Sequence, residues 1–237
     1  MNSYTITVLS YVLIPVIVTI IGGIIAAYKS PGDKVRIIVQ HFAAGVVFSA
    51  VAVELLPELL MKLEILPLII GFSLGVGLML LVRYYSEKFE SSSGSTGLVI
   101  ASGIDVFIDG LLIGVSFDVS LKAGIIVTVA LAIELLFLAL SVASSLAKEG
   151  QSKSRIIVTT ISLAILVLIG ATIGATLLQG MHSAGLEGII AFAAAALLYL
   201  VTEELLVEAH KENNDTAFAT TMFFLGFLIV LILSTLT

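Results

Sequence analysis

The sequence predicts an all-α integral membrane protein in which eight transmembrane helices form one bundle. The composition places the chain outside the soluble class, because 59% of its 237 residues are hydrophobic, 12% are charged and the mean hydropathy is +1.20. Polar or Gly/Ser-rich breaks leave eight apolar stretches, each with the roughly 20 residues that cross the hydrocarbon core. Nine of the eleven Lys and Arg residues fall in alternate loops, a pattern typical of multi-pass chains.

The apolar stretches lie near 4–28, 36–61, 65–85, 97–117, 122–147, 155–178, 185–209 and 216–236. The first has no basic segment before it and no small-residue cleavage site after it, so we interpret it as a span and not as a signal peptide. Residues 1–237 are therefore expected to form a single transmembrane domain. The Ser- and Gly-rich run 90–97 is expected to be a flexible cytoplasmic linker between the third and fourth stretches.

The basic residues set the predicted orientation in the membrane. Loops after the odd-numbered stretches hold nine Lys and Arg residues, whereas loops after the even-numbered stretches hold only Lys62 and Lys122. Because positively charged loops remain in the cytoplasm, both chain termini are predicted to be external. We expect a multi-pass protein of the cell membrane.

Glycines four residues apart indicate close packing between helices. This spacing lets helix backbones approach closely in lipid, so it predicts a tight bundle. The pairs are Gly71 and Gly75, Gly110 and Gly114, and Gly170 and Gly174.

Carboxylates inside the apolar stretches are the strongest functional signal. A charge near the bilayer centre costs a few kcal/mol, so such residues persist where a cation or a proton meets them. Lys and Arg are almost absent at the same depth, and an internal ion pair is therefore not expected. The hypothesis is a pathway for a metal cation or for protons. Its acids are Glu54, Glu58, Asp105, Asp109, Glu134, Glu203, Glu204 and Glu208.

Asp105 and Asp109 are predicted to be the centre of this pathway. They lie one helical turn apart on one face, with Cβ atoms roughly 5–6 Å apart, and Glu134 is expected at the same depth on the next helix. Carboxylates this close repel each other in a low dielectric unless a divalent cation neutralises them. The three would form a partial shell for such an ion, completed by water. The alternative is that they are protonated and hydrogen-bonded to Ser, Thr or the backbone.

Three strings in order resemble the Zrt/Irt-like, or ZIP, family of divalent metal transporters. They are HFAAGVVFSAVAVELLPELL at 41–60, DGLLIG at 109–114 and LLYLVTEELLVEAH at 197–210. The resemblance implies uptake of zinc, iron or manganese into the cytoplasm through a site between the fourth and fifth helices. It also implies that His210, with Glu204 and Glu208, receives the departing metal. Taken alone, His210 and His41 are better explained as residues that cap helices at the interface.

The resemblance is incomplete at the site. The family's His-Asn-x-Pro-Asp-Gly pattern falls on residues 105–110, where the acid and the glycine match, and of His-Glu-x-Pro-Glu-Gly only Glu134 is kept. Phe137 replaces the acid that would bridge two metals, so a two-metal centre is not expected. Losing imidazole shifts the expected preference toward harder ions such as manganese, ferrous iron or magnesium. Losing proline at 108 and 136 predicts a stiffer site.

A divalent metal transporter is therefore the leading functional hypothesis. Two alternatives remain open: a metal-binding or regulatory membrane protein that transports poorly, and a carrier of protons or another cation. An enzyme is not expected, because the two acids of an intramembrane aspartyl protease should come from separate helices. The expected partners are divalent metal ions as substrate, the lipid bilayer and, as one option, a second copy in a homodimer. Neither an organic cofactor nor nucleic acid is expected.

Overall fold

The structure is a computed structural model that describes residues 3–29, 31–62, 64–93, 95–177, 183–210 and 217–236. In these residues, 8 helical spans are long and apolar enough to cross a membrane, which confirms the predicted fold class. The elements in chain order are α1 (Ser3–Tyr28), α2 (Asp33–Ala50), η1 (Val51–Leu55), α3 (Leu56–Lys62), α4 (Ile65–Ser93), α5 (Ser95–Val119), α6 (Leu121–Lys148), α7 (Lys153–Leu177), α8 (Ser183–Tyr199), η2 (Leu200–Leu205), α9 (Leu206–His210) and α10 (Ala217–Leu236).

Two of the eight spans are interrupted by π-helix. The second span consists of α2, η1 and α3, and the seventh consists of α8, η2 and α9. Single-turn π segments inside α-helices are frequent at functional sites. Nothing in the sequence analysis predicted them. The predicted fourth and fifth helices are α5 and α6.

The expected linker 90–97 differs from the structure. Helix α4 continues to Ser93 and α5 begins at Ser95, so helix occupies most of this run. Extending an existing helix adds one hydrogen bond for each residue that it fixes, which allows α4 to outlast its apolar stretch.

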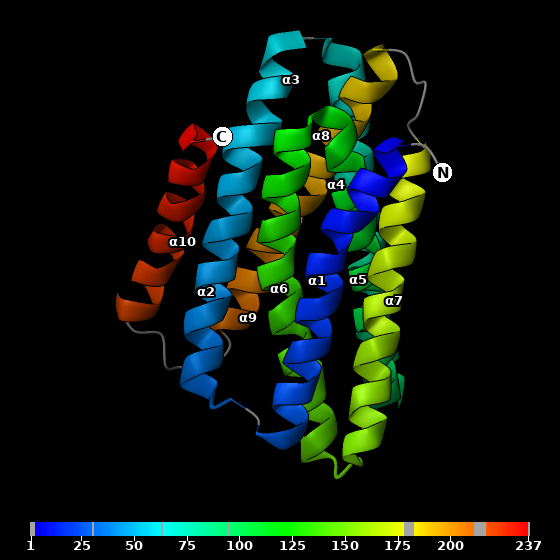
Figure 1. Ribbon diagram of the computed structural model, residues 1–237, viewed down its shortest axis with the longest axis vertical. Helices are drawn as coiled ribbons and strands as arrows, with labels where there is room; N and C mark the ends of the chain where they lie inside the picture. Colours follow the sequence, from blue (N-terminus) through cyan, green and yellow to red (C-terminus); the bar gives the residue numbers. More distant parts are fainter. Residues whose placement is uncertain are drawn as a thin grey trace.

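The ends of the bundle have different charges. Helix α1 begins and α10 ends at the same end of the bundle, as Figure 1 shows, and we name this the termini end. The opposite end, named the basic end, carries most of the Lys and Arg residues. The basic end is the one predicted to be cytoplasmic, and that orientation stays a prediction.

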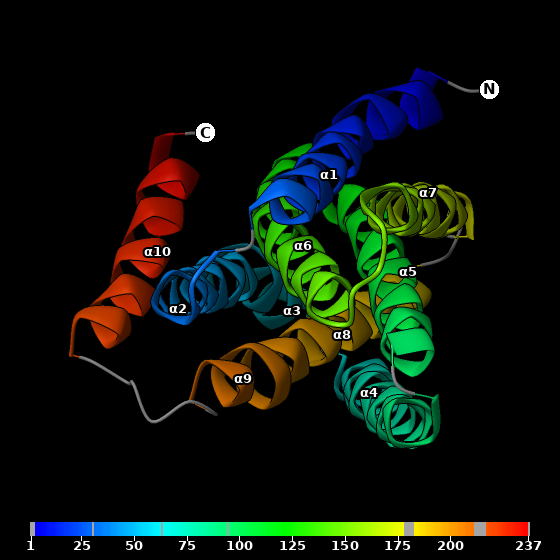
Figure 2. The same ribbon diagram turned by 90° about the horizontal axis from the view of Figure 1, so that it is seen from below.

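The helices pack in two groups that Figure 2 shows from the basic end. Helices α1, α5, α6 and α7 contact one another and form the first group. In the second group α2 packs on α10 and α4 packs on α8. The groups meet where α2 contacts α6 and where α4 contacts α5. Any relative movement of the two groups would therefore change the surroundings of α5 and α6.

The predicted glycine contacts are confirmed. A Cβ atom at Gly110 or Gly114 would clash with the α7 backbone at Val167 and Ala171, and one at Gly71 would clash with α8 at Gly188. Only glycine allows backbones to approach so closely. These contacts fix α5 against α7 and so hold the helix that carries both central aspartates.

Helix α6 is capped at both ends. The Ser120 hydroxyl accepts a hydrogen bond of 3.0 Å from the Ala123 amide, a cap typically worth about 1 kcal/mol. At the other end Gly150 adopts a φ of 77°, and the Gln151 amide donates to the Leu146 carbonyl at 3.0 Å. A left-handed glycine is a common way to end a helix. Contacts close to its two ends therefore determine where α6 begins and ends, and so determine the depth of Glu134.

Candidate metal centre

The structure brings the three predicted central carboxylates together. Asp105 and Asp109 project from α5 and Glu134 projects from α6, and one oxygen from each lies within 4.8 Å of the others. The geometry confirms that the three share one depth. We name this group the carboxylate cluster. It is the arrangement of oxygen donors that a divalent cation requires from the protein before water completes its shell.

Burial makes the carboxylate cluster electrostatically demanding. Asp109 and Glu134 are each 2% exposed, and Asp105 is partly exposed. Among the described residues, the Asp109 Oδ2 atom is buried without a hydrogen-bond partner. Nearby negative charges in a low dielectric repel, and the cost falls when a cation or a proton is shared between them. The cluster is therefore built to hold positive charge.

A cavity connects the carboxylate cluster to the basic end. Its volume is about 540 Å³, and Asp105 and Glu134 line its inner end. The lining comes from the ends of α2, α4, α5, α6 and η2 that face the basic end, and it includes Glu203 and Glu204. Asp109 lies one turn further from the mouth and is not part of the lining. An ion at the cluster would thus have an open route on one side.

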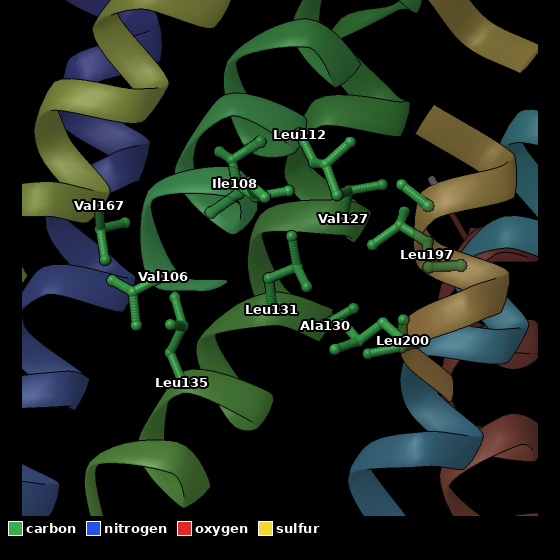
Figure 3. Close-up of a cluster of buried hydrophobic side chains, with 14 of the residues drawn as sticks. Val106, Ile108, Leu112, Val127, Ala130, Leu131, Leu135, Val167, Leu197 and Leu200 are labelled. Carbon is green, nitrogen blue, oxygen red and sulfur yellow. The ribbon is translucent and has the colours of Figure 1, made fainter. Parts of the chain in front are cut away.

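On the termini side of the cluster, apolar side chains close the route. Figure 3 shows Leu112 from α5, Val127 and Leu131 from α6 and Leu197 from α8 gathered between these helices. Each of these four side chains is at most 1% exposed. We name these four residues the apolar plug. Since a dry, packed core offers no polar partner to a hydrated ion, the structure is closed toward the termini end.

The remaining predicted acids lie at the two π segments. Glu54 is in η1, near the termini end, and Glu203 and Glu204 are in η2, near the basic end. Glu58 follows in α3 and Glu208 in α9. The predicted pathway acids therefore follow one another along the bundle, but the apolar plug separates Glu54 and Glu58 from the other acids. That they form one pathway stays a prediction.

The expectation that these acids lack cationic partners is wrong for two of them. The Lys122 ammonium lies 3.7 Å from Glu54 Oε1, and Arg83 Nη1 lies 2.8 Å from Glu203 Oε2. Lys122 lies at the start of α6 and Arg83 lies near the end of the third apolar stretch, and their long side chains reach toward the acids. The sequence gives the depth of the backbone at each Lys or Arg, and it does not give the depth that the charged group reaches.

The two predicted histidines lie against each other at the basic end. The His41 and His210 ring centroids are 5.1 Å apart, which joins α2 to α9. Each Nδ1 atom lies within hydrogen-bonding distance of a carbonyl one turn earlier, at Ile37 and Leu206. His41 is 2% exposed, whereas His210 is exposed. His210 ends α9, as expected of a residue that caps a helix, but His41 lies buried in the middle of α2, so the interpretation of His41 as a capping residue at the interface is wrong. A role of either residue in the pathway stays a prediction.

The departures from the family pattern also have visible consequences. Phe137, which stands where the resemblance implies a bridging acid, is 3% exposed and lines the cavity beside Glu134. Helices α5 and α6 stay α-helical through Ile108 and Leu136, where the resemblance implies proline. The irregular backbone of this protein lies in η1 and η2 instead.

A family model described as ZIP zinc transporter matches residues 85–234, which is more than half of the chain and includes the whole carboxylate cluster. The chain belongs to the ZIP family. No curated protein matches it. Membership in the ZIP family implies divalent metal transport and a multi-pass membrane location, and ZIP proteins are transporters and not enzymes. The match begins at residue 85, at the end of the third span, so Glu54, Glu58 and His41 lie outside it.

Sequence reasoning missed a signal that marks both π segments. Residues 42–58 align without a gap with residues 192–208, and the alignment pairs Glu54 with Glu204 and Glu58 with Glu208. Because α2 runs toward the termini end and α8 runs away from it, the two segments are antiparallel copies. Internal repeats of inverted direction are typical of transporters. Searching the chain against itself would have drawn attention to η1 and η2.

Gln40 is a residue near the carboxylate cluster that the sequence did not predict as part of the site. It lines the cavity, is 2% exposed, and has an Oε1 atom without a hydrogen-bond partner among the described residues. Its polar side chain within the apolar second span could have identified it as a candidate site residue. An amide oxygen is a suitable ligand for hard cations.

Proposed function

We propose that this ZIP protein carries a divalent metal ion across the membrane into the cytoplasm and binds it at the carboxylate cluster between α5 and α6. One observation carries the proposal. Three carboxylates with oxygens within 4.8 Å of one another stand at the inner end of a cavity that reaches one face of the bundle. Buried acids in a membrane are costly and point to an ion or proton path.

The cavity supports the proposed direction. It extends from Asp105 and Glu134 toward the basic end, where Glu203 and Glu204 line it. If that end is cytoplasmic, as the positive-inside rule predicts, the structure is in an inward-facing arrangement. A bound ion would leave along carboxylates of decreasing burial, which lowers its affinity step by step.

The donor set favours hard ions. The carboxylate cluster offers oxygen atoms from two Asp and one Glu, and no His belongs to it. Zinc sites usually include nitrogen or sulfur ligands, whereas manganese and ferrous iron accept carboxylate and water shells. We therefore propose manganese or ferrous iron as the preferred substrate ahead of zinc.

A second candidate function is a metal-binding membrane protein that transports poorly. Phe137 supports it, because this side chain fills the cavity wall where the family pattern places an acid. A single ion would bind at the cluster, but no second metal site beside it would receive the ion during release, so transport would be slow. Transport measurements separate this candidate from the first.

The test is Mn²⁺ uptake by proteoliposomes that contain the purified protein. We expect uptake above empty liposomes for the wild type, a loss of at least about tenfold in Asp109→Asn, and wild-type rates in Glu149→Gln. Glu149 is an exposed acid just after α6, so this control removes a charge without touching the cluster. Mn²⁺ binding without uptake would establish the second candidate. Equal uptake by wild type and Asp109→Asn would reject the cluster as the site.

A further inference from the structure

Lys122 links three helices at the termini end. It is the second residue of α6, directly after the capped start at Ser120. Its ammonium lies 3.7 Å from Glu54 Oε1 in η1 and donates a hydrogen bond of 2.5 Å to the Ser234 carbonyl in α10. Figure 2 shows α6, α2 and α10 side by side in that order. One side chain thus joins the group that holds the carboxylate cluster to the neighbouring group.

Both partners of Lys122 attract positive charge. The Glu54 side chain is only 8% exposed, and a buried carboxylate strongly favours a cation beside it. Ser234 lies in the last turn of α10, where carbonyls lack partners within the helix and the helix dipole is negative. The ammonium is therefore held by a carboxylate and a helix end together.

Lys122 lies on the same helix as part of the apolar plug and part of the carboxylate cluster. Lys122 and Glu134 lie on the same helix, roughly 18 Å apart at 1.5 Å rise per residue. Between them on α6 are Val127 and Leu131 of the apolar plug. Helix α6 contacts α2 and η1, so any movement that separates the termini end of α6 from η1 breaks the contact between Lys122 and Glu54.

We propose that Lys122 is a built-in cation that occupies Glu54 and holds the termini end closed until an arriving metal cation takes its place on that carboxylate. A divalent ion carries twice the charge of the ammonium and competes for the same oxygen. The Lys122 side chain is 39% exposed, so its ammonium can turn to water while the aliphatic part stays packed. Glu54 would then be the first residue of the pathway to bind the metal, and displacement of Lys122 from Glu54 would allow the termini end to open. This rests on the proposed transport function.

The absence of cysteine from the chain permits a direct test. Val127→Cys places a single thiol in the apolar plug, and Ser141→Cys places one in the cavity on the same helix. Labelling by a small charged thiol reagent is measured without metal, on protein in lipid nanodiscs, where both ends are accessible. Lys122→Gln should raise the labelling rate of Cys at 127 about fivefold or more, the change expected for losing a contact of this strength. Labelling of Cys at 141 should fall or stay equal.

Controls make the result specific to the pair. Lys148→Gln removes the same charge from the exposed far end of α6 and should leave both labelling rates unchanged. Glu54→Gln should also raise the labelling rate, and the double variant should equal Lys122→Gln alone, because Lys122→Gln already removes the contact with Glu54 together with the hydrogen bond to Ser234. Lys122→Arg should restore slow labelling, which also shows that position 122 tolerates substitution.

The outcomes separate this proposal from the proposed function. Unchanged labelling of Cys at 127 in Lys122→Gln, or additive effects in the double variant, overturns the role of Lys122 even if the wild type takes up Mn²⁺. Faster labelling with non-additive effects supports it, even if the proteoliposomes show no uptake.

Discussion

The segments η1 and η2 have related sequences and opposite surroundings. Glu54 in η1 is 8% exposed at its side chain and faces Lys122. Glu203 in η2 is 45% exposed at its side chain, faces Arg83, and lines a cavity together with Glu204. Two copies of one pattern are thus closed at the termini end and open at the basic end. Since the two segments have related sequences, we infer that access depends on packing between the helix groups and not on the π segment itself.

The packing on the two sides of the cluster can be compared with two Leu→Ala substitutions on α6. Leu131 is 0% exposed in the apolar plug, and Leu138 is partly exposed at the cavity wall. Leu131→Ala should lower stability by about 2–5 kcal/mol through lost contacts and a new void. Leu138→Ala should cost less than about 1 kcal/mol. Unfolding of both variants in the same detergent measures the difference, and equal losses would contradict a closed termini side.

Access to the two sides forms the second comparison. In the metal-free wild-type background, Cys at 141 should react with a small charged thiol reagent about 100 times faster than Cys at 127, because exposing a packed site costs a few kcal/mol. Stopped labelling followed by mass spectrometry gives both rates. Similar rates would mean that the apolar plug is open in the membrane.

The carboxylate cluster lies where the two sides meet, and Asp105→His tests its preference among metal ions. This change gives the site the imidazole that the ZIP resemblance implies, so zinc affinity should rise about tenfold relative to manganese. Binding should also become more sensitive to acid between about pH 5 and 7, since a histidine must lose its proton before it can ligate. Competition titrations at several pH values check both. An unaltered metal ranking would place Asp105 outside the coordination shell.

The smallest expected effect concerns the open side. Arg83 has a 43% exposed side chain, and its contacts with Glu87 and Glu203 face solvent, so Arg83→Gln should leave the unfolding temperature nearly unchanged. Removing its positive charge from the cavity should speed Mn²⁺ binding about two- to threefold at low salt, and the gain should vanish at high salt. Stopped-flow binding at two ionic strengths measures it. A gain independent of salt would require a steric explanation.

Much of the fold and of the candidate site could be predicted because the signals are local. Hydropathy gave eight spans, and helical spacing placed Asp105 and Asp109 on one face. Glu134 could be matched to these two residues from its depth along α6 alone. These inferences depend on residues close in sequence, or on the fixed thickness of a membrane.

The remainder depends on contacts between distant residues. The partners Lys122 and Arg83 are set by how α6, α4 and the π segments pack, which spacing within one helix does not contain. The cavity is likewise a gap between helix groups. The alignment of 42–58 with 192–208 was present in the sequence, but it marks equivalent segments and not which of them is open.

The most direct test of the central claim is anomalous diffraction from crystals soaked in Mn²⁺ and measured at the manganese absorption edge. We predict one strong peak per chain, enclosed by Asp105, Asp109 and Glu134, and its loss in Asp109→Asn crystals treated identically. A peak only at Glu203 and Glu204, or a peak at the cluster that Asp109→Asn leaves unchanged, would contradict the claim that these three carboxylates hold the transported metal.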